Sequence, residues 1–316
     1  MKKIHFNVPH KIKNINYFNN LEIFAGNGEW TNKVQKLLSK KYSFKKVLLT
    51  DSCTSALEIA ALSLKLKKND EVIIPTYAYP TTASAFMRCG YKLKFVDCNK
   101  NNPRINKLHF LKLLNKKTKA IVLVHHAGQS EDINFFLKFK KKFKFKIIED
   151  AAQCIDLKVG NKYLGSIGDF GCISFHESKN IHCGLGGALL INNNKFKNLS
   201  HYIWERGTNR KDFDKNNVKK YTWIEIGSNF YPTEFQAFYL YNQLKNISKI
   251  QTKREKKFYI YVKNLNKLIK KELILGMNLN IKSNYHMKYI LLKNLKQREK
   301  LKTFLEKKKI HCVSHY

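Results

Sequence analysis

The chain has 316 residues, and its 60 Lys and Arg against 23 Asp and Glu give a formal net charge of +37 at pH 7. Because 43% of the residues are hydrophobic and 13% are aromatic, the chain can bury a large core, which excludes a disordered polyelectrolyte. No apolar run approaches the roughly 18 residues that a membrane-spanning helix needs, so we expect a soluble cytoplasmic protein of about two domains.

The positive charge has two interpretations. It favours a polyanion partner, such as nucleic acid, an anionic membrane or a phosphorylated substrate. However, the lysines are spread from Lys2 to Lys309, and no recognisable nucleic-acid-binding motif accompanies the densest run, at 138–146. We therefore expect solvated lysines and no specific nucleic-acid or membrane partner, while weak polyanion adhesion or steering of a phosphorylated substrate stays open.

From about residue 45 to 190, short apolar runs alternate with helix-like segments. The runs lack polar alternation, which is typical of strands buried on both faces of a parallel sheet. The predicted strands are 46–50, 71–75, 93–96, 120–125, 145–149, 171–175 and 187–191. The predicted helices between them are 54–64, 81–88, 107–114 and 133–142. This alternation predicts an α/β domain with a mostly parallel sheet flanked by helices.

After residue 191 we expect helices over 198–206 and 233–244, the latter leading into a helical stretch through 269. The tail returns to strand, helix and strand, predicted at 286–292, 297–308 and 310–315. We therefore expect a large domain over 1–245, with an N-terminal segment, and a small, incomplete α+β domain over 246–316. No Pro/Gly/Ser linker separates the two, so they are expected to pack closely.

Polar side chains follow several of the predicted strands. Asp150 ends the strand in IIEDAAQ, Lys179 follows the strand in GCISFHESKN, and PTYAYPTT supplies Tyr77 and Tyr79. In DSCTSALE, small hydroxyl residues open a helix directly after a strand. Each feature has an ordinary explanation, such as a helix N-cap for Asp150 or a solvated turn for Lys179. However, open α/β sheets bind ligands at this edge of the sheet.

Together, these residue types suit pyridoxal phosphate. The cofactor needs a lysine for a Schiff base and a carboxylate that keeps its ring nitrogen protonated. It also needs an anion cradle for its phosphate and favours an aromatic face on its ring. The seven cysteines form no C-x-x-C pair and no group with zinc-ligand spacing, so we expect reduced thiols and no metal.

The arrangement closely resembles the DegT/StrS family of sugar-nucleotide aminotransferases. The resemblance runs from GNGEWT at 26–31 onward, and its other specific pieces are SCTSALE, VIIPTYAYPTTASA, VHHAG, EDAAQ, SFHESKN, GLGGALLIN, ERGTNR and KYTWIEIGSNF. The last two look most like the branch that makes dTDP-4-amino-4,6-dideoxygalactose. The resemblance implies the fold-type I architecture of pyridoxal phosphate enzymes and a homodimer with shared active sites.

The resemblance assigns roles to residues one position at a time. Lys179 is expected to bind the cofactor covalently, and Asp150 to pair with its ring nitrogen. Gln153 matches a residue that hydrogen-bonds the 3-oxygen of the ring, and Tyr79 matches an aromatic that stacks on it. The residues expected to hold the phosphate are Thr54, Ser55 and Ser174, with Asn229 reaching in from the partner subunit.

The implied reaction is a transamination in two halves. L-Glutamate gives its amino group to the cofactor, and the amine then passes to the 4-keto carbon of a dTDP-4-keto-6-deoxyhexose. Lys179 is expected to move the proton in both halves. A dehydratase branch of the family carries His in place of this Lys, so transamination is favoured. Arg210 and His315 are expected to contact the nucleotide sugar, whose epimer and keto position stay open.

Two departures from the family pattern bear on activity. Leu185 in GLGG stands where relatives usually carry Glu, which is expected to alter substrate preference. In relatives, a motif like the one at His315 and Tyr316 continues, and several dozen further residues complete the small domain. Two alternatives therefore stay open: a truncated, inactive paralogue, and a polyanion-binding protein on the same scaffold.

Overall fold

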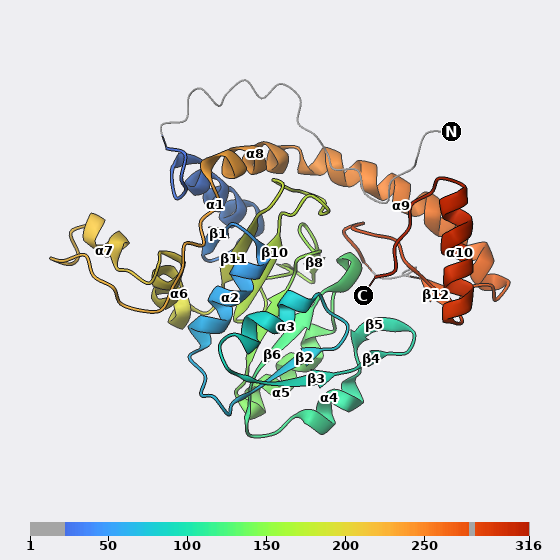
Figure 1. Ribbon diagram of the computed structural model, residues 1–316, viewed down its shortest axis with the longest axis horizontal. Helices are drawn as coiled ribbons and strands as arrows, with labels where there is room; N and C mark the ends of the chain where they lie inside the picture. The colour runs from blue at the N-terminus through green and yellow to red at the C-terminus, as the bar shows by residue number, and fades with distance from the viewer. Residues whose placement is uncertain (1–22, 278–281, 316) are drawn as a thin grey trace.

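The computed structural model describes residues 23–277 and 282–315, and its centre is a seven-stranded sheet with helices on both faces (Figure 1). The strand order is β1 (Val47–Thr50), β11 (Gly187–Ile191), β10 (Phe170–Ser174), β7 (Lys146–Asp150), β6 (Thr118–Val124), β2 (Glu71–Pro75) and β3 (Lys92–Val96). Every pair from β10 to β3 is parallel, whereas β11 runs antiparallel to β1 and β10. The predicted, mostly parallel α/β sheet is confirmed.

Most of the strands are mainly apolar because both of their faces are buried, whereas the edge strand β3 exposes Lys92 and Phe95. In β1, Leu48 packs into the layer on one side of the sheet, and Val47 and Leu49 pack into the layer on the other. The first layer contains α2 (Cys53–Leu64), α3 (Pro80–Met87) and α6 (Lys197–Trp204). The second contains α1 (Glu29–Tyr42), α4 (Lys107–Leu113), α5 (Ile133–Phe143) and α8 (Glu234–Lys245).

Several short elements decorate this framework and were not predicted. They are the hairpins β4 (Cys98–Asn99) with β5 (Asn102–Ile105) and β8 (Lys158–Val159) with β9 (Lys162–Tyr163), and the short helix α7 (Arg210–Asp214). The helix α1 was also missed, because its polar sequence buries only Thr31, Val34, Leu38 and Tyr42. None of the helices in the described part of the chain combines the length and the apolar character that crossing a bilayer requires.

The C-terminal part contains α9 (Ile247–Lys270), β12 (Gly276–Met277), β13 (Ile290–Leu291) and α10 (Leu295–Lys307). The strand predicted over 286–292 shrinks to β13, which pairs only with β12. The strand predicted over 310–315 is reduced to a bridge at Ile310 and is wrong over 311–315, because a strand extends only where a neighbour completes its backbone hydrogen bonds. The division at residue 245, between α8 and α9, stays a prediction.

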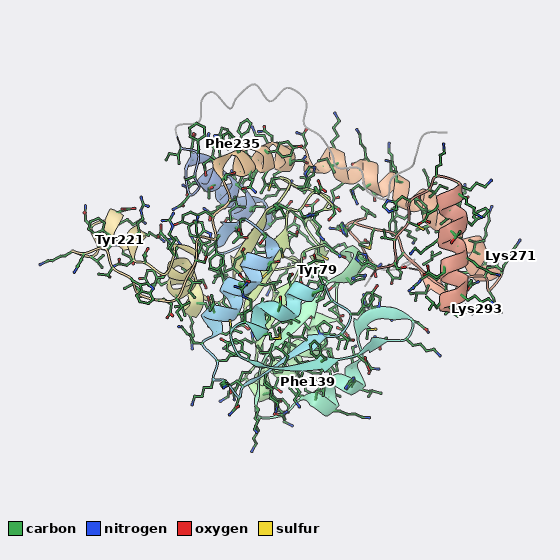
Figure 2. The ribbon with its side chains drawn as sticks, viewed as in Figure 1. Tyr79, Phe139, Tyr221, Phe235, Lys271 and Lys293 are labelled. Carbon is green, nitrogen blue, oxygen red and sulfur yellow. The ribbon has the colours of Figure 1, made fainter. Side chains whose placement is uncertain are left out.

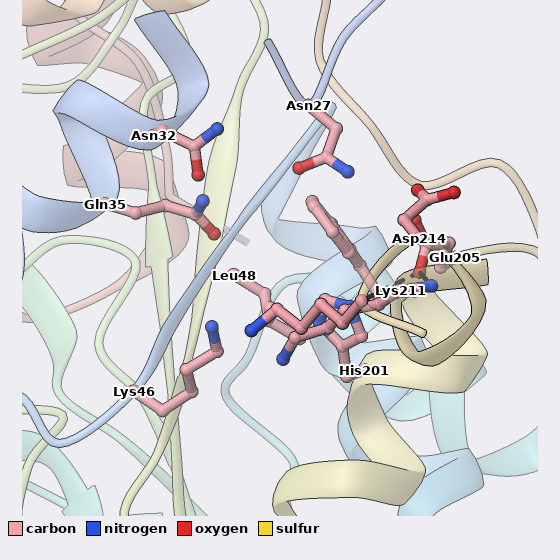
Figure 3. Close-up of a pocket in the computed structure, with 11 residues that line it drawn as sticks. Asn27, Asn32, Gln35, Lys46, Leu48, His201, Glu205, Lys211 and Asp214 are labelled. Atoms are coloured by element: carbon pink, nitrogen blue, oxygen red, sulfur yellow. Dashed lines mark hydrogen bonds and ion pairs between the residues drawn. The ribbon is translucent and has the colours of Figure 1, made fainter. Parts of the chain in front are cut away.

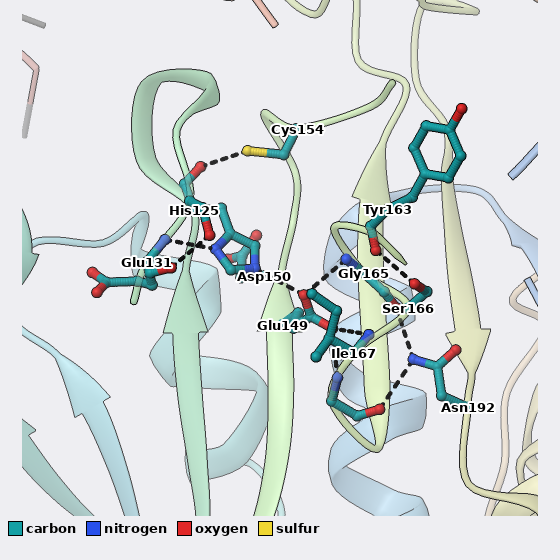
Figure 4. Close-up of polar contacts among 12 residues, drawn as sticks. His125, Glu131, Glu149, Asp150, Cys154, Tyr163, Gly165, Ser166, Ile167 and Asn192 are labelled. Carbon is teal, nitrogen blue, oxygen red and sulfur yellow. Dashed lines mark hydrogen bonds and ion pairs between the residues drawn. The ribbon is translucent and has the colours of Figure 1, made fainter. Parts of the chain in front are cut away.

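A fully buried carboxylate, Glu149 on β7, ties the sheet to the loop before β10 (Figure 4). Its Oε1 accepts the N–H groups of Ile167 and Gly168 at 2.7 and 2.6 Å, and its Oε2 accepts that of Gly165 at 2.9 Å. The Nε2 of His125 lies 2.9 Å from the same Oε2. Since His125 Nδ1 accepts a backbone N–H, its proton is on Nε2 and points at the carboxylate.

We expect Glu149→Gln to lower the free energy of unfolding by about 2–4 kcal/mol. The backbone N–H groups that donate to the carboxylate of Glu149 would then face the side-chain N–H₂ group of Gln, which cannot accept a hydrogen bond. Urea denaturation of the full chain measures the change. Glu306→Gln, on an exposed residue of α10, is the matched control and should change stability by less than about 0.5 kcal/mol. Equal stability of the two variants would show that Glu149 does not hold the loop.

Candidate active site

The carboxyl ends of the strands that run parallel, β1, β2, β6, β7 and β10, meet at one edge of the sheet, and most of the predicted site residues follow them. Asp150 ends β7, Ser174 ends β10, and Lys179 follows in the next loop. Tyr79 lies at the start of α3, near the middle of the molecule, with 58% of its surface exposed (Figure 2). The topology therefore gathers residues that are far apart in the sequence.

Lys179 and Asp150 are electrostatically coupled. Burial lowers the pKa of the Lys179 amine, and Cys53, Asp150 and Cys154 act in the opposite direction. The backbone N–H of Lys179 donates to His176 O at 2.9 Å, which holds the lysine in a tight turn. A lowered pKa enlarges the fraction of neutral amine, which is the form that can act as a nucleophile or a base.

The carboxylate of Asp150 is held by two donors. Its Oδ2 accepts a hydrogen bond from Thr82 Oγ1 at 2.7 Å, and its Oδ1 accepts one from Ala152 N at 3.1 Å. Thr82 is buried on α3 and was not predicted as part of the site. The two donors therefore fix the position of this carboxylate at the end of β7.

Ser52 and Ser55 organise the start of α2. Ser52 Oγ accepts the N–H of Ser55 at 3.1 Å, and the two hydroxyl oxygens lie 2.9 Å apart. Gly187 lets the start of β11 approach this turn, because a Cβ there would lie 2.4 Å from the carbonyl carbon of Ser52. Thr54 is half-buried and Ser174 is buried, so hydroxyl groups and first-turn N–H groups of a helix form an anion-binding arrangement.

Gln153 is buried in the loop after β7. Its Oε1 accepts the N–H of Ala127 at 2.5 Å, which leaves Nε2 as the donor of this side chain. Gly128, with φ of +71°, continues the Ala127 turn, and a Cβ there would lie 2.0 Å from Asn284 Oδ1. The C-terminal part of the chain therefore packs directly against this loop.

Asn180 and Asn284 join the lysine loop, the Gln153 loop and the C-terminal part. Asn180 donates to Asn284 O at 2.8 Å, and its Oδ1 lies 2.9 Å from His286 Nδ1. Asn284 Nδ2 donates to the carbonyl oxygens of Gln153 and Ile155, both at 2.9 Å. Sequence reasoning missed this network, because nothing in the local sequence marks it.

Three histidines around Lys179 have lowered pKa values. Burial is the largest cause for each, and it lowers the pKa of His126 to about 3 and that of His286 well below its usual range. The pKa of His315 is lowered by burial and by Lys179, and its carbonyl accepts the hydroxyl of Tyr77 at 2.8 Å. The structure therefore places His315 near Lys179, and its contact with the nucleotide sugar stays a prediction.

Two predicted residues are not gathered at this edge within one chain. Arg210 is exposed at the start of α7, far to the side of the sheet in Figure 1, and its Nε lies 3.5 Å from Asp214. Asn229 is exposed and forms an isolated bridge with Glu205. Its reach into a partner subunit stays a prediction, as does the contact of Arg210 with substrate. Leu185 is 57% exposed.

The comparisons with known proteins identify the family. The family model described as the DegT/DnrJ/EryC1/StrS aminotransferase family matches residues 10–316. The chain belongs to this family. It is 26% identical to GDP-perosamine synthase of Escherichia coli O157:H7 over 90% of this chain and 76% of that protein.

Two further comparisons come from Helicobacter pylori. The chain is 29% identical to UDP-4-amino-4,6-dideoxy-N-acetyl-beta-L-altrosamine transaminase over 72% of this chain and 60% of that protein. The structure of PseC, an aminotransferase involved in the biosynthesis of pseudoaminic acid, matches with a TM-score of 0.88 and 25% identity, over 100% of this chain and 85% of that one.

Other structures with this fold carry pyridoxal phosphate or its amine form. The chain spans about 60% of the length of most curated relatives that it matches.

We expect Asn284→Ala to lower the free energy of unfolding by about 2–3 kcal/mol, because two buried carbonyl groups lose their donor. Urea denaturation measures the loss. Asn284→Asp should be comparably destabilising, since it keeps the acceptor for the His286 N–H but removes the donors. Asn264→Ala, on an exposed residue of α9, is the control, and a loss no larger than that of the control would contradict the role of this network.

Proposed function

We propose that this protein is a pyridoxal phosphate-dependent aminotransferase acting on a nucleotide-linked keto-deoxysugar. The observation that carries the proposal is the coupling of Lys179 to Asp150: a buried amine with a lowered pKa within electrostatic reach of a carboxylate that accepts two hydrogen bonds. Membership in an aminotransferase family supports the same chemistry.

The residues present suit the cofactor. Lys179 would bind it covalently, and Asp150, positioned by Thr82, would pair with the ring nitrogen. Gln153 offers its Nε2 donor to the 3-oxygen of the ring, because its Oε1 is already engaged by Ala127. Tyr79 would cover the ring. The residues that would hold the phosphate are Thr54, Ser55, Ser174 and Asn229 of the partner subunit.

The cofactor, when bound, supplies an electron sink for loss of a proton next to nitrogen. Lys179 supplies the base: burial keeps a neutral amine available to take that proton at Nζ and to return it. The neighbouring imidazoles of His126 and His286 are neutral and compete little for protons, because burial lowers their pKa values.

The finer assignment rests on the sequence resemblance. We propose L-glutamate as the amino donor and a dTDP-4-keto-6-deoxyhexose as the acceptor, giving dTDP-4-amino-4,6-dideoxygalactose or a close relative. A homodimer would place Asn229 and Arg210, both exposed in one chain, at the partner's site. The names of two relatives contain GDP and UDP, so the nucleotide is the point that most needs a test.

We expect the full chain mixed with pyridoxal phosphate to show a visible absorbance band that added glutamate bleaches, because the cofactor passes to its amine form. Lys179→Ala should bind the cofactor without this band and should transfer no amino group. Lys195→Ala, on an exposed lysine, is the control and should behave as the parent chain. A folded parent chain without the band would overturn the proposed function.

We expect dTDP to be preferred over UDP and GDP when the same 4-keto-6-deoxyhexose is offered on each nucleotide. A tenfold higher kcat/KM corresponds to about 1.4 kcal/mol of differential binding, which a few base contacts can provide. Mass spectrometry of the amino sugar, with glutamate as donor, gives the three rates. Faster turnover of the UDP or GDP sugar would reject dTDP while leaving the transamination intact.

A further inference from the structure

A cavity of about 320 Å³ lies along the edge strand β1 (Figure 3). Its walls come from α1, β1, α6 and α7. Lys46, which borders it, directly precedes β1, whereas the candidate active site gathers at the carboxyl end of the same strand. The cavity and the active site therefore lie at opposite ends of β1.

The cavity concentrates positive charge. It is lined by Lys46, Lys211 and Lys215, and Figure 3 shows the side chains of Lys46 and Lys211 reaching toward the same space beside Leu48. None of these three lysines forms an ion pair with a residue that the structure describes. Burial, followed by the charges of Lys211, Lys197 and Lys215, lowers the pKa of Lys46 to about 8.

The carboxylates that line the same cavity are already engaged. Glu205 accepts the backbone N–H of Lys211 at 3.2 Å and the hydroxyl of Tyr231 at 3.0 Å. Asp214 lies 3.5 Å from Arg210 Nε. Neither makes an ion pair with a lysine ammonium, so the half-buried charge of Lys46 lacks a counter-charge among the described residues.

His201 adds a second observation. It lines the cavity with only 7% of its surface exposed, and its Nδ1 has no hydrogen-bond partner in the described part of the chain. Its Nε2 lies 3.3 Å from Glu205 Oε2, and burial is the largest cause of its lowered pKa, so the ring adds no positive charge to the cavity. Hydrogen phosphate offers what the lysines lack, which is anionic oxygens for their ammonium groups.

We propose that this cavity binds a phosphate-class anion: inorganic phosphate, pyrophosphate or the phosphates of a nucleotide. A volume of 320 Å³ is about ten times the share of one water molecule, which accommodates any of these groups. Lys46 and Lys211 hold the anion, and Lys215 and Lys197 add to the attractive field. The cavity shares no residue with the strand-end site of the same chain, although α7, which lines it, also carries Arg210, which the proposed homodimer would place at the partner's site.

Residue-resolved lysine acetylation tests the site on the unaltered chain. With a lowered pKa, Lys46 is partly neutral near pH 7.5 and should react readily with acetic anhydride. About 10 mM phosphate should reduce its acetylation about fivefold relative to sodium chloride of equal ionic strength, because the bound anion favours the charged amine. The exposed Lys116 and Lys117 should be unaffected. Unchanged labelling of Lys46 by phosphate, pyrophosphate and uridine diphosphate would overturn the proposal.

The double variant Lys46→Met/Lys211→Met provides the matching loss of function. Phosphate should raise the Tm of the parent chain, and this rise should be smaller in the double variant. Lys116→Met/Lys117→Met removes the same charge elsewhere and should keep the full rise. An undiminished rise in the double variant counts against the site. Protection of Lys46 by uridine diphosphate at lower concentration than by phosphate identifies a nucleotide as the source, and equal protection identifies the free anion.

Discussion

The buried carboxylate of Glu149 is the constraint on which the site depends. It accepts three backbone N–H groups from the loop before β10 and faces the Nε2 proton of His125, so it joins β7, the end of β6 and the entry to β10. Asp150 is the next residue, and Lys179 follows the strand that this loop introduces. The buried charge of Glu149 is thus stabilised only if these three segments take their native positions together. The same positions bring Lys179 and Asp150 within electrostatic reach of each other.

Lysines of this chain have two different kinds of surroundings. Around Lys179, burial lowers the pKa values of His126, His286 and His315, so the amine is surrounded by neutral rings and one carboxylate. Along the outer edge of β1, the lysines of the cavity instead repel one another, and among the residues that the structure describes no carboxylate lies at ion-pair distance from them. The first arrangement makes an amine reactive, whereas the second favours the binding of an anion.

The parts of the structure that follow local rules could be predicted from the sequence. Six of the seven strands of the main sheet are largely buried on both faces, and the positions of all seven agree with prediction to within two residues at each end. The strand predicted over 310–315 kept only a bridge at Ile310, because a pairing neighbour, which no local pattern reveals, decides how far a strand extends. Thr82 and Asn284 were missed for a related reason: their partners Asp150 and Gln153 lie 68 and 131 positions away.

The contacts of Asn180 and Asn284 bear on how relatives can be recombined. The segment 283–286 supplies the hydrogen bonds that hold the residue next to Lys179 and the backbone of Gln153. A chimera that exchanges C-terminal domains between family members therefore needs positions 180, 284 and 286 from one parent. If they come from different parents, the side-chain amide beside Lys179 loses its hydrogen-bond partners, although no residue that touches substrate has changed.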